Sequence, residues 1–103
     1  MDNLILRSGG ANHIIDDKLI SGKLDLYPDK LIFQVHKFHN PSYDTEILLS
    51  EIQKIEFFNT LDFVPNGLTL VLKDGSNEKF TLNFRKGWRS EIEDLIAQNT
   101  HAL

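Results

Sequence analysis

Apolar and polar residues alternate along most of this chain, and that alternation limits it to structures built mainly of strands. Segment 22–36 shows the pattern in two runs: Leu24 and Leu26 share one face of the first run, and Leu31 and Phe33 share one face of the second. Side chains of a strand point alternately to opposite faces, so each run predicts a strand with one buried face. The sequence Tyr-Pro-Asp-Lys between the runs supplies a tight turn, and the segment is therefore predicted to form a β-hairpin.

The same period of two recurs in four more segments, residues 4–15, 45–49, 52–58 and 67–84. Segment 67–84 predicts a second hairpin, because Asp74-Gly75 supplies the positive φ that a hairpin turn requires. Its second strand is expected to bury Phe80, Leu82 and Phe84. In segment 4–15, the pair Gly9-Gly10 predicts a strand with either a β-bulge or a close approach of another segment to the backbone.

The period changes near the C-terminus, where Trp88, Ile92, Leu95 and Ile96 stand at i, i+4, i+7 and i+8. This spacing predicts one amphipathic helix of about three turns. With 103 residues, the chain is expected to form a single domain spanning residues 1–103. About seven strands with one apolar face each must close into a barrel or sandwich. The predicted fold is mainly β: a pleckstrin-homology-like, seven-stranded antiparallel barrel or sandwich, with one C-terminal α-helix at its open end.

Three stretches of the sequence resemble the GRAM domain, a branch of the pleckstrin-homology superfold. They are "GKLDLYPDKLIF", "ILLSEIQKIEFF" and "LTLVLKDGSNEKFTL", followed by the helix that Trp88 leads. The chain is most similar to small, stand-alone bacterial GRAM-like proteins, with which it shares Asn12-His13, a cluster at 36–40 and a segment like "NTLGxxPNG". It departs from the pattern in the additional His39 and in Asp62, which stands in place of Gly. The resemblance implies the fold, whereas this superfold hosts lipid, peptide and protein ligands alike.

Charge and composition exclude several classes of function. The formal net charge is −4, and the longest basic run is Arg85-Lys86, so no nucleic-acid partner is expected. No stretch approaches the roughly 20 apolar residues of a transmembrane helix. Asp2 stands where a signal peptide needs positive charge, and the chain has no cysteine. We therefore expect a cytoplasmic protein without disulfides or thiolate metal sites.

Polar residues gather at "HKFHN", residues 36–40, which the resemblance groups with Asn12 and His13. The candidate polar cluster is Asn12, His13, His36, His39 and Asn40. On a continuing strand, His36 and His39 point to opposite faces, and they converge only if the chain bends after Lys37. Three imidazoles are enough for zinc in principle, but no carboxylate stands at a metal-ligand spacing. We expect strand-end residues that hydrogen-bond to the main chain, with no metal and no cofactor.

Two further functional interpretations are disfavoured by the residues themselves. Ser50, His36 and Asp44 are the nearest approach to a catalytic triad, but no nucleophile elbow surrounds Ser50, so no catalytic residue is expected. In pleckstrin-homology domains, phosphoinositides are usually bound by Lys and Arg around the first inter-strand loop. That loop here carries Asp16 and Asp17, whose charges repel a phosphorylated headgroup. Specific phosphoinositide binding is not expected, and a weak membrane-surface contact is the most that the loop allows.

The segment "FFNTLDFVPNGL" supplies the candidate partner-binding residues Leu61, Phe63 and Val64. Either the loop folds back and these residues cap the barrel mouth, or they form an exposed apolar patch that contacts a partner or a membrane. No Lys or Arg occurs between Lys54 and Lys73, and Asp62 lies inside the patch. A membrane-inserting loop normally carries basic residues, so an exposed patch favours protein docking or self-association.

The expected function is that of a noncatalytic binding or adaptor module that acts through protein–protein contacts. The partner is an unknown protein or a second copy of the chain in a homo-oligomer. A peripheral, lipid-surface binding module is the alternative, and a metal-binding protein that uses the histidine cluster is a minor alternative.

Overall fold

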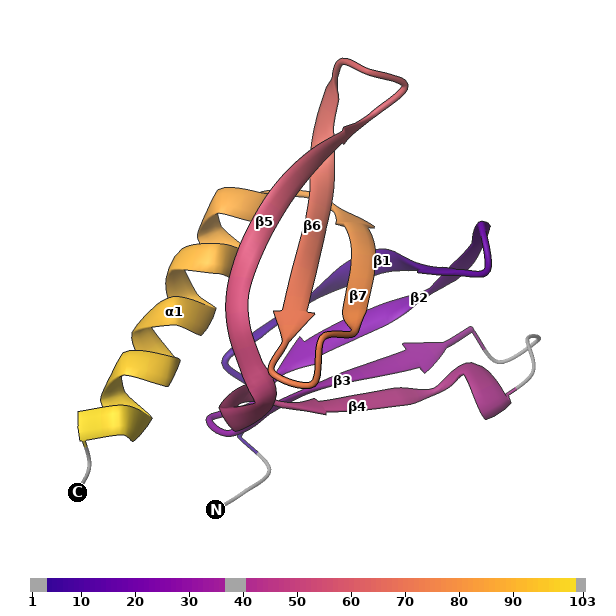
Figure 1. The fold of residues 1–103 in the computed structure, drawn as a ribbon. Coiled ribbons are helices and arrows are strands. Elements are labelled where there is room, and N and C mark those ends of the chain that lie inside the picture. Colours follow the sequence, from indigo (N-terminus) through magenta and orange to yellow (C-terminus); the bar gives the residue numbers. More distant parts are fainter. Residues whose placement is uncertain (1–3, 37–40, 102–103) are drawn as a thin grey trace.

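The computed structural model describes residues 4–36 and 41–101, which form one curled, seven-stranded antiparallel sheet and a C-terminal helix (Figure 1). The strands are β1 (Arg7–Ile15), β2 (Lys18–Leu26), β3 (Lys30–Val35), β4 (Thr45–Leu48), β5 (Ile52–Thr60), β6 (Val64–Leu72) and β7 (Asn77–Leu82). The helix α1 spans Arg85–His101, and two short 3₁₀ turns, η1 (Pro41–Tyr43) and η2 (Leu49–Glu51), flank β4. The predicted fold class, mainly β with one C-terminal helix, is confirmed.

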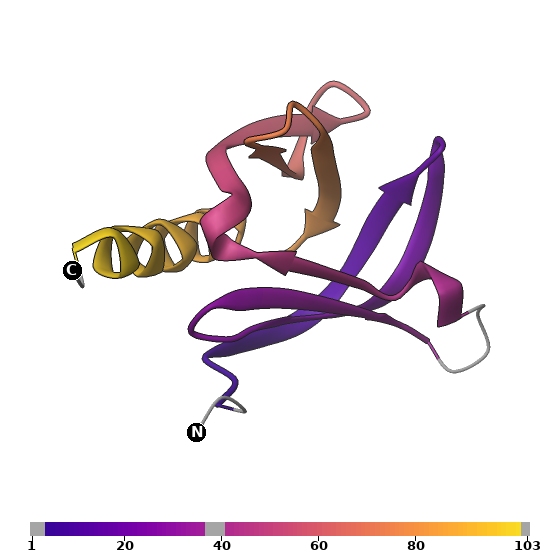
Figure 2. The same cartoon turned by 60° about the horizontal axis from the view of Figure 1, so that its bottom comes forward.

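Strand β1 joins the two halves of the sheet. The strand order is β4-β3-β2-β1-β7-β6-β5, and β1 pairs with β2 along its whole length and with β7 through residues 11–14. Strands β5 to β7 run across the direction of β2 to β4, so the halves enclose the core between them (Figures 1 and 2). The result is a half-barrel, along whose open side α1 runs beside β5 (Figure 1).

Both predicted hairpin turns are confirmed. The amide of Tyr27 donates to the carbonyl of Lys30 over 2.8 Å, which closes the β2–β3 turn. In the β6–β7 turn, Gly75 adopts a φ of 92°. The carboxylate of Asp74 accepts hydrogen bonds from the hydroxyl of Ser76 at 2.6 Å and from its amide at 2.8 Å. These bonds stabilise the ionised form and hold the pKa of Asp74 below its ordinary value.

The predicted bulge at Gly9-Gly10 is wrong, because β1 and β2 stay in register from Arg7 opposite Leu26 to Ile15 opposite Lys18. Gly9 instead faces Trp88 of the helix. A Cβ atom at Gly9 would lie 3.6 Å from the indole ring of Trp88, which is an ordinary van der Waals distance, so this contact does not require a glycine.

The prediction that Phe84 packs in the core is also wrong. Strand β7 ends at Leu82, and Phe84 adopts a φ of 58° with a side chain that is 82% exposed. Its carbonyl accepts the amides of Gly87 at 3.0 Å and Trp88 at 3.1 Å, so Phe84 is the residue from which α1 begins. The left-handed backbone turns the chain out of the sheet, and the alternation of the strand stops before it reaches Phe84.

Helix α1 is anchored by two residues of its predicted apolar stripe. Trp88 is 4% exposed and Ile92 is 1% exposed, whereas Leu95 and Ile96 are half-buried at the margin of the core. The core that they join is formed by alternate residues of the strands, among them Leu24, Leu26, Phe33, Leu68, Leu70 and Phe80. Among residues 4–36 and 41–101, no helix is long and apolar enough to cross a membrane.

Replacing Trp88 with Ala is expected to lower the free energy of unfolding by about 3–5 kcal/mol, because it removes the largest buried side chain of α1. Chemical denaturation measures the change. Leu19→Ala is the control: it truncates an exposed apolar side chain of β2 and should change stability by less than about 0.5 kcal/mol. A loss below about 1 kcal/mol for Trp88→Ala would contradict the anchoring role.

Candidate functional site

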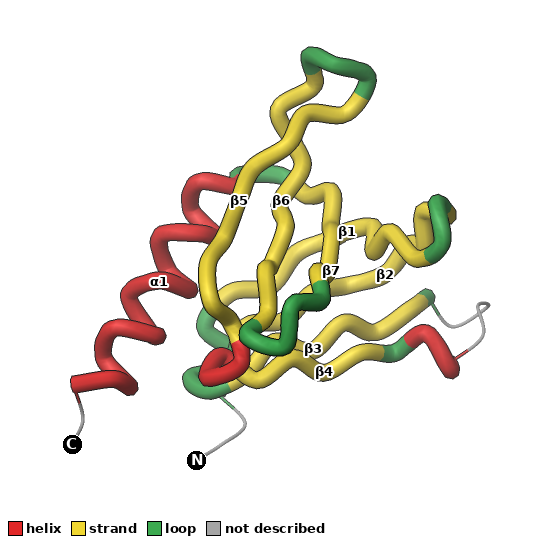
Figure 3. Tube along the Cα trace, viewed as in Figure 1, coloured by secondary structure: helices red, strands yellow, loops and turns green. Residues whose placement is uncertain are grey.

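The β5–β6 hairpin carries an exposed apolar tip, formed by Leu61, Asp62 and Phe63. Leu61 is 79% exposed and Phe63 is 77% exposed, and Asp62 between them is exposed as well. Leu61 and Asp62 adopt φ values of 49° and 66°, and the amide of Phe63 donates to the carbonyl of Thr60 over 3.2 Å. The tip extends beyond the other strands (Figure 3). The alternative in which this segment caps the barrel mouth is therefore wrong for Leu61 and Phe63.

The third residue of the predicted patch differs from the other two. Val64 is the first residue of β6 and is only partly exposed, since it pairs with Thr60 across the hairpin. It therefore belongs to the stem of the hairpin and leaves Leu61 and Phe63 as the large apolar side chains of the tip.

Arg85, at the start of α1, holds the stem of this hairpin in place. Its Nη1 atom donates to the carbonyl of Phe58 at 2.7 Å and to the carbonyl of Gly67 at 3.2 Å. Its guanidinium carbon lies 4.4 Å from the centre of the Phe57 ring, a distance typical of cation–π stacking. One side chain from α1 thus bridges β5 and β6 where their register is irregular, so the tip stands on a fixed base.

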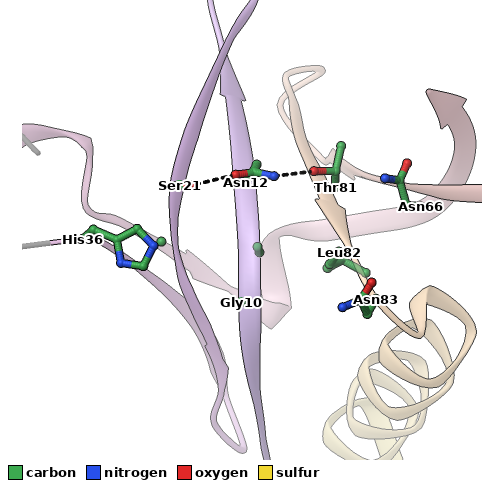
Figure 4. A pocket seen from close by; sticks show the side chains of 10 residues that line it. Gly10, Asn12, Ser21, His36, Asn66, Thr81, Leu82 and Asn83 are labelled. Atoms are coloured by element: carbon green, nitrogen blue, oxygen red, sulfur yellow. Dashed lines mark hydrogen bonds between the residues drawn. The ribbon is translucent and has the colours of Figure 1, made fainter. Parts of the chain in front are cut away.

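The candidate polar cluster is brought together only in part. Asn12 and His36 line an open pocket of about 260 Å³ on the outer face of the sheet, together with Ser21, Asn66, Thr81 and Asn83 (Figure 4). The hydroxyl of Ser21 donates to Oδ1 of Asn12 at 2.8 Å, and Nδ2 of Asn12 donates to Oγ1 of Thr81 at 3.1 Å. These three residues form a hydrogen-bonded row across β2, β1 and β7 (Figure 4).

His13 lies on the other face of β1, in the core. Its side chain stacks on Phe80 with ring centres 4.5 Å apart and meets Phe33 edge-on at 5.3 Å. Nε2 of His13 lies 2.8 Å from Oε1 of Glu78, while the buried Nδ1 has no hydrogen-bond partner among the described residues. Since Asn12 and His13 are consecutive on a strand, they point to opposite faces, and His13 is separated from His36. His39 and Asn40 lie outside the described residues.

The polar pocket offers neutral groups for recognition and little for catalysis. Its polar lining residues carry amides and hydroxyls, and among the described residues that line it, His36 is the one with a titratable side chain. Sequence reasoning found Asn12 and His36 but missed Ser21 and Thr81. The register of the β1–β2 hairpin places Ser21 opposite Asn12 and could have identified Ser21. Thr81 lies opposite Asn12 through the pairing of β1 with β7, which are distant in the sequence.

The first inter-strand turn has the acidic surface that the sequence indicated. Asp16 and Asp17 are exposed, with φ values of 50° and 66°, and they form the two-residue turn between β1 and β2. Any ligand that approaches this turn therefore meets two carboxylates before it meets Lys18.

Comparisons with known proteins define the class of fold. No protein-family model matches the sequence, and no curated protein matches it significantly. Among solved structures, the C-terminal domain of an unknown protein from Leishmania infantum is 18% identical, with a TM-score of 0.78 over 91% of this chain and 84% of that chain. The Vps36 N-terminal PH domain is 11% identical, with a TM-score of 0.73 over 94% of this chain and 81% of that chain.

A third neighbour is the Slm1 PH domain in complex with phosphoserine, which is 18% identical, with a TM-score of 0.63 over 88% of this chain and 91% of that chain. The predicted pleckstrin-homology-like fold is thereby confirmed. At these identities the likeness concerns the fold alone, and the narrower assignment to bacterial GRAM-like proteins stays a prediction.

Purified protein is expected to contain well below one zinc ion per chain, as measured by elemental analysis. Among residues 4–36 and 41–101, no three His, Asp or Glu side chains gather closely enough to hold a metal ion, and His13 and His36 lie on opposite faces of the sheet. A full equivalent of zinc that is lost when both His36 and His39 are changed to Ala would contradict this expectation.

Proposed function

We propose that this chain is a noncatalytic binding module whose β5–β6 tip docks a protein partner. The observation that carries the proposal is the exposure of Leu61, at 79%, and of Phe63, at 77%, on a hairpin that extends from the sheet. Exposed apolar residues that gather at one place usually mark a contact surface. An aromatic side chain at the centre of such a surface is the usual source of binding energy, and Phe63 has that position.

The anchoring of the hairpin stem by Arg85 supports the same function. Arg85 bonds the carbonyls of Phe58 and Gly67, so the two strands that carry the tip are held together before a partner binds. A surface that is already ordered loses less conformational entropy on binding, which raises affinity for a given contact area. The apolar tip therefore has the properties of a preformed docking element.

The fold is compatible with this function. The Slm1 PH domain has been solved in complex with phosphoserine and with inositol 4-phosphate, so this architecture serves as a binding domain in that protein. For the present chain, the acidic Asp16-Asp17 turn argues against phosphorylated ligands at the β1–β2 end. The exposed apolar side chains of the tip favour a protein surface as the partner. Peripheral membrane binding through the same tip is the competing outcome.

Phe63→Asp is expected to abolish the capture of a partner from the native cell, because it places a charge at the centre of the contact. The expected loss is about 2 kcal/mol or more, or about thirtyfold in Kd. Affinity purification with mass-spectrometric identification compares this variant with the wild-type protein as bait. Circular dichroism should be unchanged, since Phe63 is exposed.

Leu19→Asp is the matched control, because Leu19 is an exposed apolar residue of β2 in the β1–β2 hairpin. It should retain every partner that the wild-type protein captures. Equal capture by Phe63→Asp and the wild-type protein would contradict docking through the tip. Sedimentation with anionic liposomes that is lost in Phe63→Asp would assign the tip to a membrane surface.

A further inference from the structure

A basic pocket with an apolar wall opens at the base of the same hairpin, beside the start of α1. Its volume is about 600 Å³, and it is lined by Arg7, Pro65, Phe84, Arg85, Lys86 and Gly87. Phe84, which is 82% exposed, and Pro65, which is exposed as well, form its apolar part. Three of the six lining residues are cations and none is an acid, although the protein as a whole has a net charge of −4.

Most of this positive charge has no ion-pair partner among residues 4–36 and 41–101. Arg7 pairs with Glu91 at 2.8 Å. Arg85 donates its hydrogen bonds to neutral oxygens of β5 and β6, and Lys86 is exposed. In the part of the chain that the structure describes, no carboxylate lies within ion-pair distance of Arg85 or Lys86. The first turn of α1 contains no acidic residue either, so the helix dipole adds to the positive potential.

The tip of the hairpin has the complementary chemistry. Its sequence, Leu61-Asp62-Phe63, places one exposed carboxylate between two exposed apolar side chains. The pocket offers cations beside an apolar wall, so the carboxylate and the apolar groups of the tip each find a counterpart there. Pro65, which lines the pocket, is two residues from Phe63, so the tip and the pocket lie at neighbouring positions of one hairpin.

We propose that a second copy of this chain is a partner of the tip, and that the tip of each copy enters the basic pocket of the other. This inference rests on the proposed function and names the partner. A two-fold axis satisfies both contacts at once, because a protomer that presents a tip also presents a pocket. The carboxylate of Asp62 meets Arg85 and Lys86 of the second copy, and Phe63 packs against Phe84 and Pro65. An anionic membrane would instead meet the carboxylate of Asp62 at the tip.

A charge-reversal cycle tests the pairing of Asp62 with Lys86, with light scattering over a concentration series as the measurement. The wild-type protein should form a dimer, and Phe63→Asp should be monomeric. Asp62→Lys and Lys86→Glu should each weaken the dimer by about tenfold or more, since a two-fold dimer contains every contact twice. The double variant Asp62→Lys/Lys86→Glu should recover most of the wild-type affinity. Lys86→Glu also puts an acid in the first turn of α1, which favours the helix, so weaker association would not reflect unfolding.

The β1–β2 turn supplies matched controls for both reversals. Asp17 has the same φ of 66° as Asp62 and is exposed, and Lys18 follows it as an exposed lysine. Asp17→Lys and Lys18→Glu repeat the charge changes at a different hairpin and should leave the dimer unchanged. If these two control variants weaken the dimer as much as Asp62→Lys and Lys86→Glu do, the change in net charge is responsible and the proposal is overturned.

Crosslinking tests the geometry directly, because the natural chain has no cysteine. A mixture of two single-cysteine variants, Leu61→Cys and Lys86→Cys, treated with a short bis-maleimide should give a crosslinked heterodimer. Lys18→Cys mixed with Leu61→Cys should not. The reciprocal dimer would be overturned by any one of three results. The crosslinked product of Leu61→Cys with Lys86→Cys does not form, the wild-type protein is monomeric at every concentration, or the double variant does not recover the affinity of the wild-type dimer. Docking of another protein through Phe63 would survive those results, since it is measured separately by affinity purification.

Discussion

The pairing of β1 with both β2 and β7 is the constraint on which the rest of the molecule depends. It turns His13 toward the core, where the imidazole stacks on Phe80, and it turns Asn12 outward. The amide of Asn12 then bridges Ser21 of β2 and Thr81 of β7. A single strand thus connects the two halves of the sheet through an aromatic contact on one face and a hydrogen-bonded row on the other.

The backbone conformation just after β7 determines which side chains are exposed at the start of α1. Phe84 leaves the sheet in a left-handed conformation, which exposes its ring and places Arg85 at the start of α1. Arg85 reaches back to the carbonyls of Phe58 and Gly67, so the helix and the β5–β6 hairpin are fixed to each other. One left-handed residue therefore produces an exposed aromatic ring, a brace for the hairpin and a basic pocket at its base.

The sequence predicted the features that depend on local periodicity and missed those that depend on distant contacts. The alternation of Leu24, Leu26 and Phe33 is enough to define strands, and the helical spacing of Trp88 and Ile92 is enough to define α1, because burial enforces both patterns. Phe84 continues the alternation of apolar and polar residues in the sequence. The strand has already ended at Leu82, however, and the backbone turns out of the sheet at Phe84 so that α1 can pack against it. The basic pocket beside the hairpin is another feature that depends on distant contacts. No cation is near Phe63 in the sequence, yet Arg85 and Lys86 line a pocket together with Pro65.

Asp62 is informative because the backbone alone does not require it. At a φ of 66°, glycine would fit with less strain, and Asp is among the few other residues that tolerate this region. What Asp62 adds to the turn is its carboxylate. Between Leu61 and Phe63, a charge opposes nonspecific apolar association, since a partner must neutralise it before it can bury the neighbouring side chains. A partner surface with cations beside an apolar wall meets that condition, and the start of α1 presents such a surface.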